Sequence, residues 1–200
     1  EKNWNYQLGY DINIENGNGE RISEDAGTFI DAGLFGSLNW SPNHRWNFQP
    51  GMRWAYNNNY NAPIVPSIHV KYNISATTLL RASYAHGFRA PSIKELYLEF
   101  VDQNHRIYGN QDLLPENSKN MNVSVIWRNE MANGKKSIKL EPSIYYNHIF
   151  DKIQLVQTGS SNLEYTYQNI TDYETFGGKI ELNYNIHPDF SFGVGAGWLG

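Results

Sequence analysis

Apolar and polar residues alternate along nearly the whole chain, and this period of two is the feature that most restricts its fold. Successive side chains of a β-strand point to opposite faces of a sheet, so the alternation predicts strands with one apolar and one polar face. In the first segment, one face carries Trp4, Tyr6, Leu8, Tyr10, Ile12 and Ile14, and the other carries Asn5, Gln7, Gly9, Asp11 and Asn13. The pattern predicts an all-β chain.

Turn-forming residues divide the alternating pattern into nine segments. We expect strands near residues 4–14, 28–40, 45–56, 63–74, 78–86, 118–130, 136–149, 164–186 and 189–199. The connections are short turns at 41–44, 75–77, 131–135 and 187–188, and longer loops at 15–27, 57–62, 87–117 and 150–163. Loops and turns alternate along the chain, as they do in an up-and-down membrane barrel with short turns on one side and long loops on the other.

The composition suits a sheet that lies between lipid and water. Aromatic residues make up 14% of the chain and charged residues only 18%. The 16 Lys and Arg against 20 Asp and Glu leave no basic excess, so nucleic acid is not an expected partner. The chain has no cysteine, which excludes disulfides and thiol nucleophiles. No apolar run approaches the ~18 residues of a membrane-spanning helix.

Strand length and the positions of tryptophan favour a membrane barrel over a soluble β-sandwich. Several segments are longer than the ~5–6 residues usual in soluble sheets and reach the ~9–11 needed to cross a bilayer. Trp4, Trp40, Trp46, Trp127 and Trp198 lie near segment ends, as in the aromatic girdles of membrane barrels. We therefore predict an antiparallel up-and-down transmembrane β-barrel, with apolar faces toward lipid and polar faces toward the lumen.

The number of strands indicates part of a larger barrel. Bacterial single-chain barrels have an even number of strands, and an open sheet of nine would leave two unpaired edges. We expect residues 1–200 to be an internal segment of the barrel. The opening Glu1-Lys2-Asn3-Trp4 lacks the apolar stretch of a signal peptide, and the end at Leu199-Gly200 is not a terminal aromatic residue. Both features fit this expectation.

Two short motifs lie on either side of the 87–117 loop. Phe88-Arg89-Ala90-Pro91 comes first, and Asn110-Gln111-Asp112-Leu113 follows about twenty residues later. Together with residues 78–91, Tyr167-Gln168-Asn169 and residues 177–182, they resemble the barrel of TonB-dependent outer-membrane receptors. One departure is Gln111, because the family usually has a proline there that fixes φ and stiffens the turn.

The resemblance implies a receptor in the outer membrane of a Gram-negative bacterium, which imports a scarce nutrient with energy from TonB. Haem is the favoured cargo, and an iron–siderophore or a cobalamin is the alternative; the partner is the free chelate or a haem-carrying protein. Such barrels have roughly 22 strands and a plugged lumen. The family's plug domain, through which TonB acts, precedes the barrel and lies outside residues 1–200. Membrane lipid is expected around the barrel, no intrinsic cofactor is expected, and the chain is not expected to be an enzyme.

The resemblance also implies a cargo site in the 87–117 loop. Haem receptors of the family carry a histidine between the two motifs, and here that residue is His105, which would supply a nitrogen to haem iron. Arg89 and Tyr97 are expected near the porphyrin, and His86 is a further candidate. Alternatives remain open: His105 as an exposed loop residue, Arg89 as an anchor to a carboxylate, and His86 as a girdle residue at the membrane interface.

Two structural expectations concern the longest connections. Pro91, Pro115 and the aromatic residues Tyr97, Phe100 and Tyr108 predict that 87–117 folds into a compact loop, in which 93–100 forms a short helix or extends a strand. The 164–186 segment is too long for one membrane crossing. It is therefore expected to project beyond the bilayer, with a bend at Gly177-Gly178.

Two other functions stay open on the sequence alone. A soluble carbohydrate-binding or adhesin module would use the exposed aromatic residues as sugar platforms. A membrane hydrolase would need a catalytic constellation, but neither a Gly-x-Ser-x-Gly nor a His-Glu-x-x-His motif is present.

Overall fold

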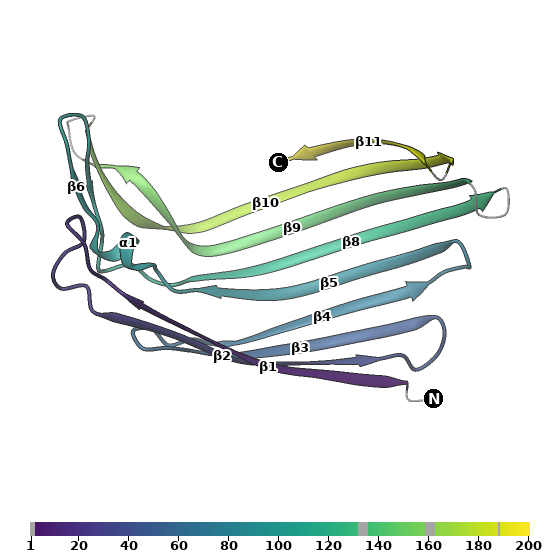
Figure 1. Ribbon diagram of the computed structural model, residues 1–200, viewed down its shortest axis with the longest axis horizontal. Coiled ribbons are helices and arrows are strands. Elements are labelled where there is room, and N and C mark those ends of the chain that lie inside the picture. Colours follow the sequence, from purple (N-terminus) through teal and green to yellow (C-terminus); the bar gives the residue numbers. More distant parts are fainter. Residues whose placement is uncertain (1–2, 132–135, 159–162, 188) are drawn as a thin grey trace.

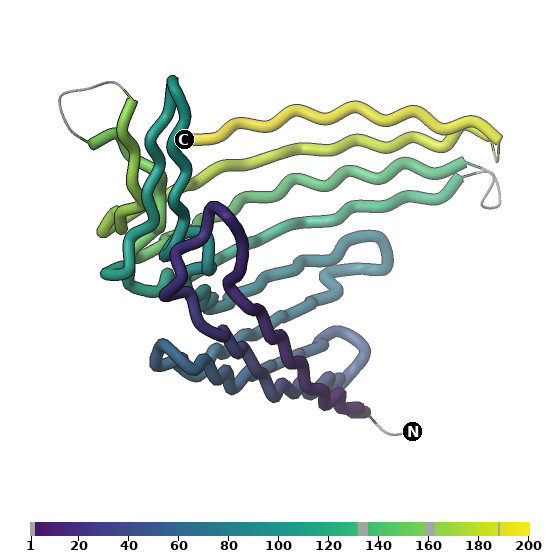
Figure 2. The backbone as a smooth tube through the Cα atoms, turned by 60° about the vertical axis from the view of Figure 1, so that its left-hand side comes forward, coloured from purple at the N-terminus to yellow at the C-terminus, as the bar shows by residue number. Residues whose placement is uncertain are grey.

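The chain forms one curved antiparallel sheet, with short turns at one end and longer loops at the other (Figures 1 and 2). The computed structural model describes residues 3–131, 136–158, 163–187 and 189–200. Nine long strands follow one another: β1 (Trp4–Asn16), β2 (Thr28–Trp40), β3 (Trp46–Asn57), β4 (Ile64–Asn73), β5 (Thr78–Arg89), β8 (Glu116–Met131), β9 (Lys136–Gln157), β10 (Glu164–His187) and β11 (Phe190–Leu199). The predicted nine-strand segment of an up-and-down barrel is confirmed.

The sheet is open, with β1 at one edge and β11 pairing only with β10 among the described strands. An unpaired edge exposes backbone N–H and C=O groups, which membrane proteins satisfy by closing the sheet into a barrel. No helix among the described residues is long and apolar enough to span a membrane.

One face of the sheet is apolar and exposed over its whole width. Side chains on this face are well exposed even at large residues such as Trp54 at 67% and Met52 at 57%. We call this surface the apolar belt; its members include Tyr6, Leu8, Tyr10, Leu34, Met52, Trp54, Ile64, Ile68, Met121, Val123, Ile144, Phe176, Ile180 and Val194. No second sheet covers it within the described residues, so these side chains do not form the core of a sandwich. An exposed apolar band of this width is typical of a lipid-facing barrel wall.

The opposite face carries the polar residues and is held by cross-strand contacts. Arg53 donates to both carboxylate oxygens of Asp11, at 2.7 and 2.8 Å, across the intervening strand. Gly33 lies between them, and a side chain at this position would collide with the Arg53 guanidinium. The pairing shows how a lumen-facing glycine makes room for an ion pair between strands that are not neighbours.

The loop end differs from the prediction in two ways. β9 continues to Gln157 rather than ending near residue 149, so much of the predicted 150–163 loop is strand. The β9–β10 ladder runs without a break through Gly177 and Gly178, and the irregular position is Asp151, whose φ is +53°. The predicted bend at Gly177-Gly178 is therefore wrong. β10 does extend well beyond the end of β11, which pairs only as far as Gly177.

The 87–117 loop contains structure of its own. It holds the short helix α1 (Ile93–Tyr97) and a hairpin of β6 (Glu99–Val101) and β7 (Arg106–Tyr108). β7 pairs in parallel with the start of β10, so the hairpin adds two short strands at the loop end of the sheet (Figure 1). The helical spacing of 93–100 thus corresponds to one turn of helix followed by a strand.

Candidate functional site

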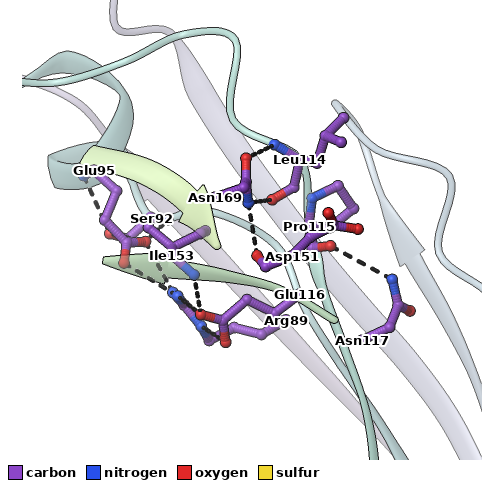
Figure 3. Close-up of polar contacts among 10 residues, drawn as sticks. All are labelled: Arg89, Ser92, Glu95, Leu114, Pro115, Glu116, Asn117, Asp151, Ile153 and Asn169. Atoms are coloured by element: carbon purple, nitrogen blue, oxygen red, sulfur yellow. Dashed lines mark hydrogen bonds and ion pairs between the residues drawn. The ribbon is translucent and has the colours of Figure 1, made fainter. Parts of the chain in front are cut away.

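Arg89 is the centre of an ion-pair cluster at the base of the 87–117 loop (Figure 3). As the last residue of β5 it lies opposite Glu116, the first residue of β8. Its guanidinium donates to Glu116 at 2.8 and 2.9 Å and to Glu95 of α1 at 2.8 and 3.1 Å. Glu116 also accepts a hydrogen bond from the backbone N–H of Ile153 at 2.7 Å. The two carboxylates thus tie β5, β8, β9 and α1 together.

The helix that supplies Glu95 begins with a capping box. The Ser92 hydroxyl accepts from the Glu95 backbone N–H, and the Glu95 carboxylate accepts from the Ser92 backbone N–H at 2.8 Å. A Ser or Thr followed three residues later by Glu is the sequence signature of this cap. The signal was therefore present in Ser92-x-x-Glu95, although the sequence did not show that Arg89 would share the carboxylate.

The ion pairs shift the acidity of all three groups. Burial is the largest single effect and raises the pKa of Glu95 and Glu116. The hydrogen bonds and charge of Arg89, acting together with hydrogen bonds from Ser92 to Glu95 and from the Ile153 backbone N–H to Glu116, outweigh burial, and the pKa of each carboxyl lies below its ordinary value. The hydrogen bonds to Glu116 likewise raise the pKa of Arg89 further above its ordinary value. The cluster is therefore fully charged at neutral pH.

Two asparagines fasten the second motif to the sheet. Asn169 of β10 accepts from the Leu114 backbone N–H at 2.8 Å and donates to the Leu114 and Asp151 carbonyl oxygens at 2.9 and 2.6 Å (Figure 3). Asn110 donates to the Tyr167 carbonyl at 2.9 Å and accepts from the Asp112 backbone N–H at 3.0 Å. The Tyr-x-Asn segment of β10 and the second motif thus form one hydrogen-bonded unit.

Tyr97 and the motif residues Leu113 and Pro91 are packed at the loop end of the sheet. A small core at the loop end consists of Ala26, Phe29, Ile93, Leu96, Leu113 and Ile153. Tyr97 packs against it and meets the ring of Phe29 edge to face at 6.1 Å. Leu113 is 2% exposed, and Pro91 is buried as well. Gly109 passes so close to the Leu96 backbone that no side chain fits there. Phe29 and Ile153 come from β2 and β9, so this core spans much of the sheet's width.

His105 lies at the tip of the β6–β7 hairpin, exposed to solvent. The Asp102 carboxylate accepts from the His105 backbone N–H at 2.6 Å, and the imidazole Nδ1 lies 3.4 Å from the same oxygen. The side chain of His105 remains 54% exposed. The three residues of β7 separate it from Gly109 at the base, a span of four residue steps or roughly 13 Å at the usual rise of a strand. His105 therefore lies away from the base of the hairpin, with its side chain exposed to solvent.

His86 lies on the other face of the sheet. It is three residues before Arg89, and its neighbours on the same face are Tyr84 and Lys119. The imidazole Nε2 lies 2.7 Å from the Tyr84 hydroxyl. His86 thus has the position of an outward-facing girdle residue, and one ligand on the inner face would not meet both His86 and Arg89.

The inner face also has a hollow of about 390 Å³ over β4, β5 and β8. Lys71 and Arg81 are directly opposite each other there, beside His69. No described carboxylate pairs with either cation, since Glu141 in the same hollow pairs with Lys139 at 2.6 Å. Among the described residues, no group of three or more His, Asp or Glu side chains is arranged to hold a metal ion.

Comparisons with known proteins agree with this geometry. The chain is 26% identical over 162 residues to the Vibrio cholerae "Iron-regulated outer membrane virulence protein", covering 74% of this chain and 24% of that protein. It is 40% identical over 53 residues to the Haemophilus influenzae "Hemoglobin and hemoglobin-haptoglobin-binding protein A", covering 26% of this chain and 5% of that protein. The chain thus spans about a quarter or less of the length of these curated relatives.

The fold also has solved counterparts. The siderophore receptor PirA from Pseudomonas aeruginosa superposes with a TM-score of 0.79 at 16% identity, over 98% of this chain and 36% of that chain. The sequence matches the family "TonB dependent receptor-like, beta-barrel" over residues 1–199. Together with the one-sided apolar sheet, this match shows that the chain belongs to the TonB-dependent receptor-like β-barrel family.

Proposed function

We propose that this chain forms part of the barrel wall of an outer-membrane receptor that imports an iron chelate in a Gram-negative bacterium, energised through TonB. The observation that carries the proposal is the family match over residues 1–199, on a sheet whose apolar face is exposed and whose polar face turns inward. The Vibrio relative is iron-regulated by name, which supports iron as the nutrient class.

Haem is the cargo we favour, either free or delivered by a haem-carrying protein. The Haemophilus relative binds haemoglobin by name, and His105 stands exposed on an outer hairpin, where an imidazole can reach haem iron. Arg89 and Tyr97 are engaged with the loop base and its core. We assign them to holding the hairpin in place, with His105 as the contact of this loop to cargo. A siderophore or a cobalamin is the alternative cargo.

The test is haem binding and haem-dependent growth of cells that carry the full-length receptor with His105→Ala. We expect weaker haem binding with the receptor inserted normally, because the substituted side chain is exposed and makes no packing contact in the core. His44→Ala is a matched control, since His44 lies in the short turn between β2 and β3, at the end of the sheet opposite to the 87–117 loop. Unchanged haem uptake by the His105→Ala receptor would show that His105 does not contact the cargo. If the receptor supports growth on a siderophore and does not bind haem, the cargo is the siderophore and not haem.

A further inference from the structure

A row of polar side chains crosses the outer face at the loop-side edge of the apolar belt. His86 of β5 is paired with Lys119 of β8, Lys119 with His148 of β9, and His148 with Glu174 of β10. The next row toward the turns is Tyr84, Met121, Tyr146 and Phe176. Met121 is 47% exposed and Phe176 54% exposed, so the belt is still open to lipid at that level. The polar row therefore lies where hydrocarbon gives way to headgroups.

The wall has a gap at this level. The ladder between β4 and β5 ends at Ser67 and Ala85, whereas β5 stays paired with β8 as far as Arg89 and Glu116. A hollow of about 280 Å³ lies where the strands separate. Its lining includes Pro63, Ile64, His86, Asn117, Lys119 and Phe150. Beyond Ser67 and Ala85, the backbone N–H and C=O groups of β4 and β5 that face each other no longer pair in this ladder, and they make one side of the hollow polar.

The hollow holds a cation that lacks an acidic partner among the described residues. The Lys119 Nζ lies 5.2 Å from the centroid of the Phe150 ring, and no described carboxylate forms an ion pair with it. The acids on the same face of β10 are already engaged: His148 Nε2 lies 2.8 Å from Asp172 and 3.8 Å from Glu174. They belong to β10, two strands from Lys119, or roughly 10 Å at the usual strand spacing.

We propose that this hollow binds the phosphate of a lipid headgroup in the outer leaflet. Lys119 supplies the charge, while His86 and Asn117 supply hydrogen bonds beside it. The acyl chains of the same lipid lie on Met121, Val123 and Ile144 below, which are 47%, 39% and 60% exposed. A lipid fits better than an acidic protein because the hollow is continuous with the apolar belt, so that one molecule covers both surfaces. The proposal rests on the proposed outer-membrane location, but not on the identity of the cargo.

The experiment measures lipid binding to the purified full-length receptor in detergent, by native mass spectrometry. The probes are a bis-phosphorylated lipid A and its dephosphorylated form with the same acyl chains. Lys119→Gln should weaken binding of the phosphorylated lipid about fivefold, the effect expected for one cation near an anionic surface. Lys119→Arg should retain binding. Lys136→Gln, which removes the same charge at the turn end of β9, is the matched control and should change nothing.

Three outcomes would overturn the assignment. Equal binding of the phosphorylated lipid by the wild-type and Lys119→Gln receptors would show that Lys119 does not contribute to lipid binding. An equal loss for the dephosphorylated lipid would show that the substitution acts through packing and not through phosphate. Displacement of the lipid by millimolar inorganic phosphate alone would identify a free-anion site instead. Iron uptake by the same variants is scored separately, so that failure of the transport proposal and failure of the lipid proposal remain distinct.

Discussion

At the scale of single residues, the family motifs of this chain act as anchors. The guanidinium of Arg89 is a planar fork, and it uses this geometry on two carboxylates that come from different elements. The interpretation of Arg89 as an anchor agrees with these contacts. What the sequence could not supply were the partners, because Glu95 and Glu116 are ordinary loop and strand-end glutamates until the fold brings them to Arg89. The capping box at Ser92 was the one local pattern from which Glu95 could have been singled out.

Replacing Arg89 tests this role. Arg89→Ala leaves two partly buried carboxylates facing each other, and we expect a loss of about 1–2 kcal/mol in local loop stability, a figure discounted because Arg89 is 44% exposed. Arg89→Lys keeps the charge but cannot bridge both groups with parallel bonds, so its loss should be smaller but measurable. Hydrogen exchange of the amides in residues 92–113 is the measurement. Arg128→Ala, which removes an exposed pair with Glu130, should leave that exchange unchanged.

At the scale of elements, alternation predicted the long strands well and the loop structure poorly. The nine segments appear as β1 to β5 and β8 to β11, because successive side chains of a strand alternate between the apolar and the polar face of the sheet. β6 and β7 are three residues each, too short to leave a periodic pattern. β7 pairs with the β10 edge, and β6 pairs with β7. The sequence pattern does not predict the continuation of β9 past residue 149, for a related reason. The positive φ at Asp151 interrupts the alternation without ending the strand.

We expect the 87–117 loop to become more mobile in acid, at a pH set by the protonation of Glu95 and Glu116. The pKa of both Glu95 and Glu116 is lowered in the folded loop, whereas glutamate in an unfolded chain titrates near 4.3. Their contribution to stability is therefore complete above about pH 4.3 and is lost as the pH falls through the lowered values. This chain has no cysteine, so a spin label at Lys94→Cys on α1 would report the change without interference from residues 1–200.

We expect the Lys94 label to keep the same mobility between pH 7 and pH 5, and to become mobile below about pH 4. A label at Ser83→Cys, within β5, should show no such step. Combining the Lys94 label with Glu95→Gln and Glu116→Gln should give a loop that is already mobile at pH 7. A loop that loosened between pH 7 and pH 5 in the wild-type background would show that some group other than these carboxyls controls it.

At the scale of the whole molecule, the two faces of the sheet carry different kinds of side chain. The outer face carries the apolar belt and ends in the polar row, and the inner face carries the ion pairs and the cationic hollow. The loop core joins β2 to β9 across the inner side, although four strands separate them in the sheet. It therefore braces the curvature of the wall. The brace and the exposed hairpin are built from one continuous loop, so the hairpin tip at His105 is connected to the wall through the loop core.

The assignment of the apolar face to lipid can be tested with two adjacent residues. Val123 faces outward and is 39% exposed, whereas Asn122 faces inward and lines the polar hollow. Val123→Lys places a charge in hydrocarbon and should cost about 2–4 kcal/mol. Asn122→Lys should cost less, because the lumen side is polar and only repulsion from Lys71 and Arg81 in the same hollow opposes the new charge. The measurement is the urea dependence of folding of the full-length receptor into lipid vesicles. A water-soluble sheet with the same face open to solvent would accept Lys at position 123 about as readily as at position 122, so equal costs would contradict the membrane orientation. A cost confined to position 123 would place lipid against the apolar belt.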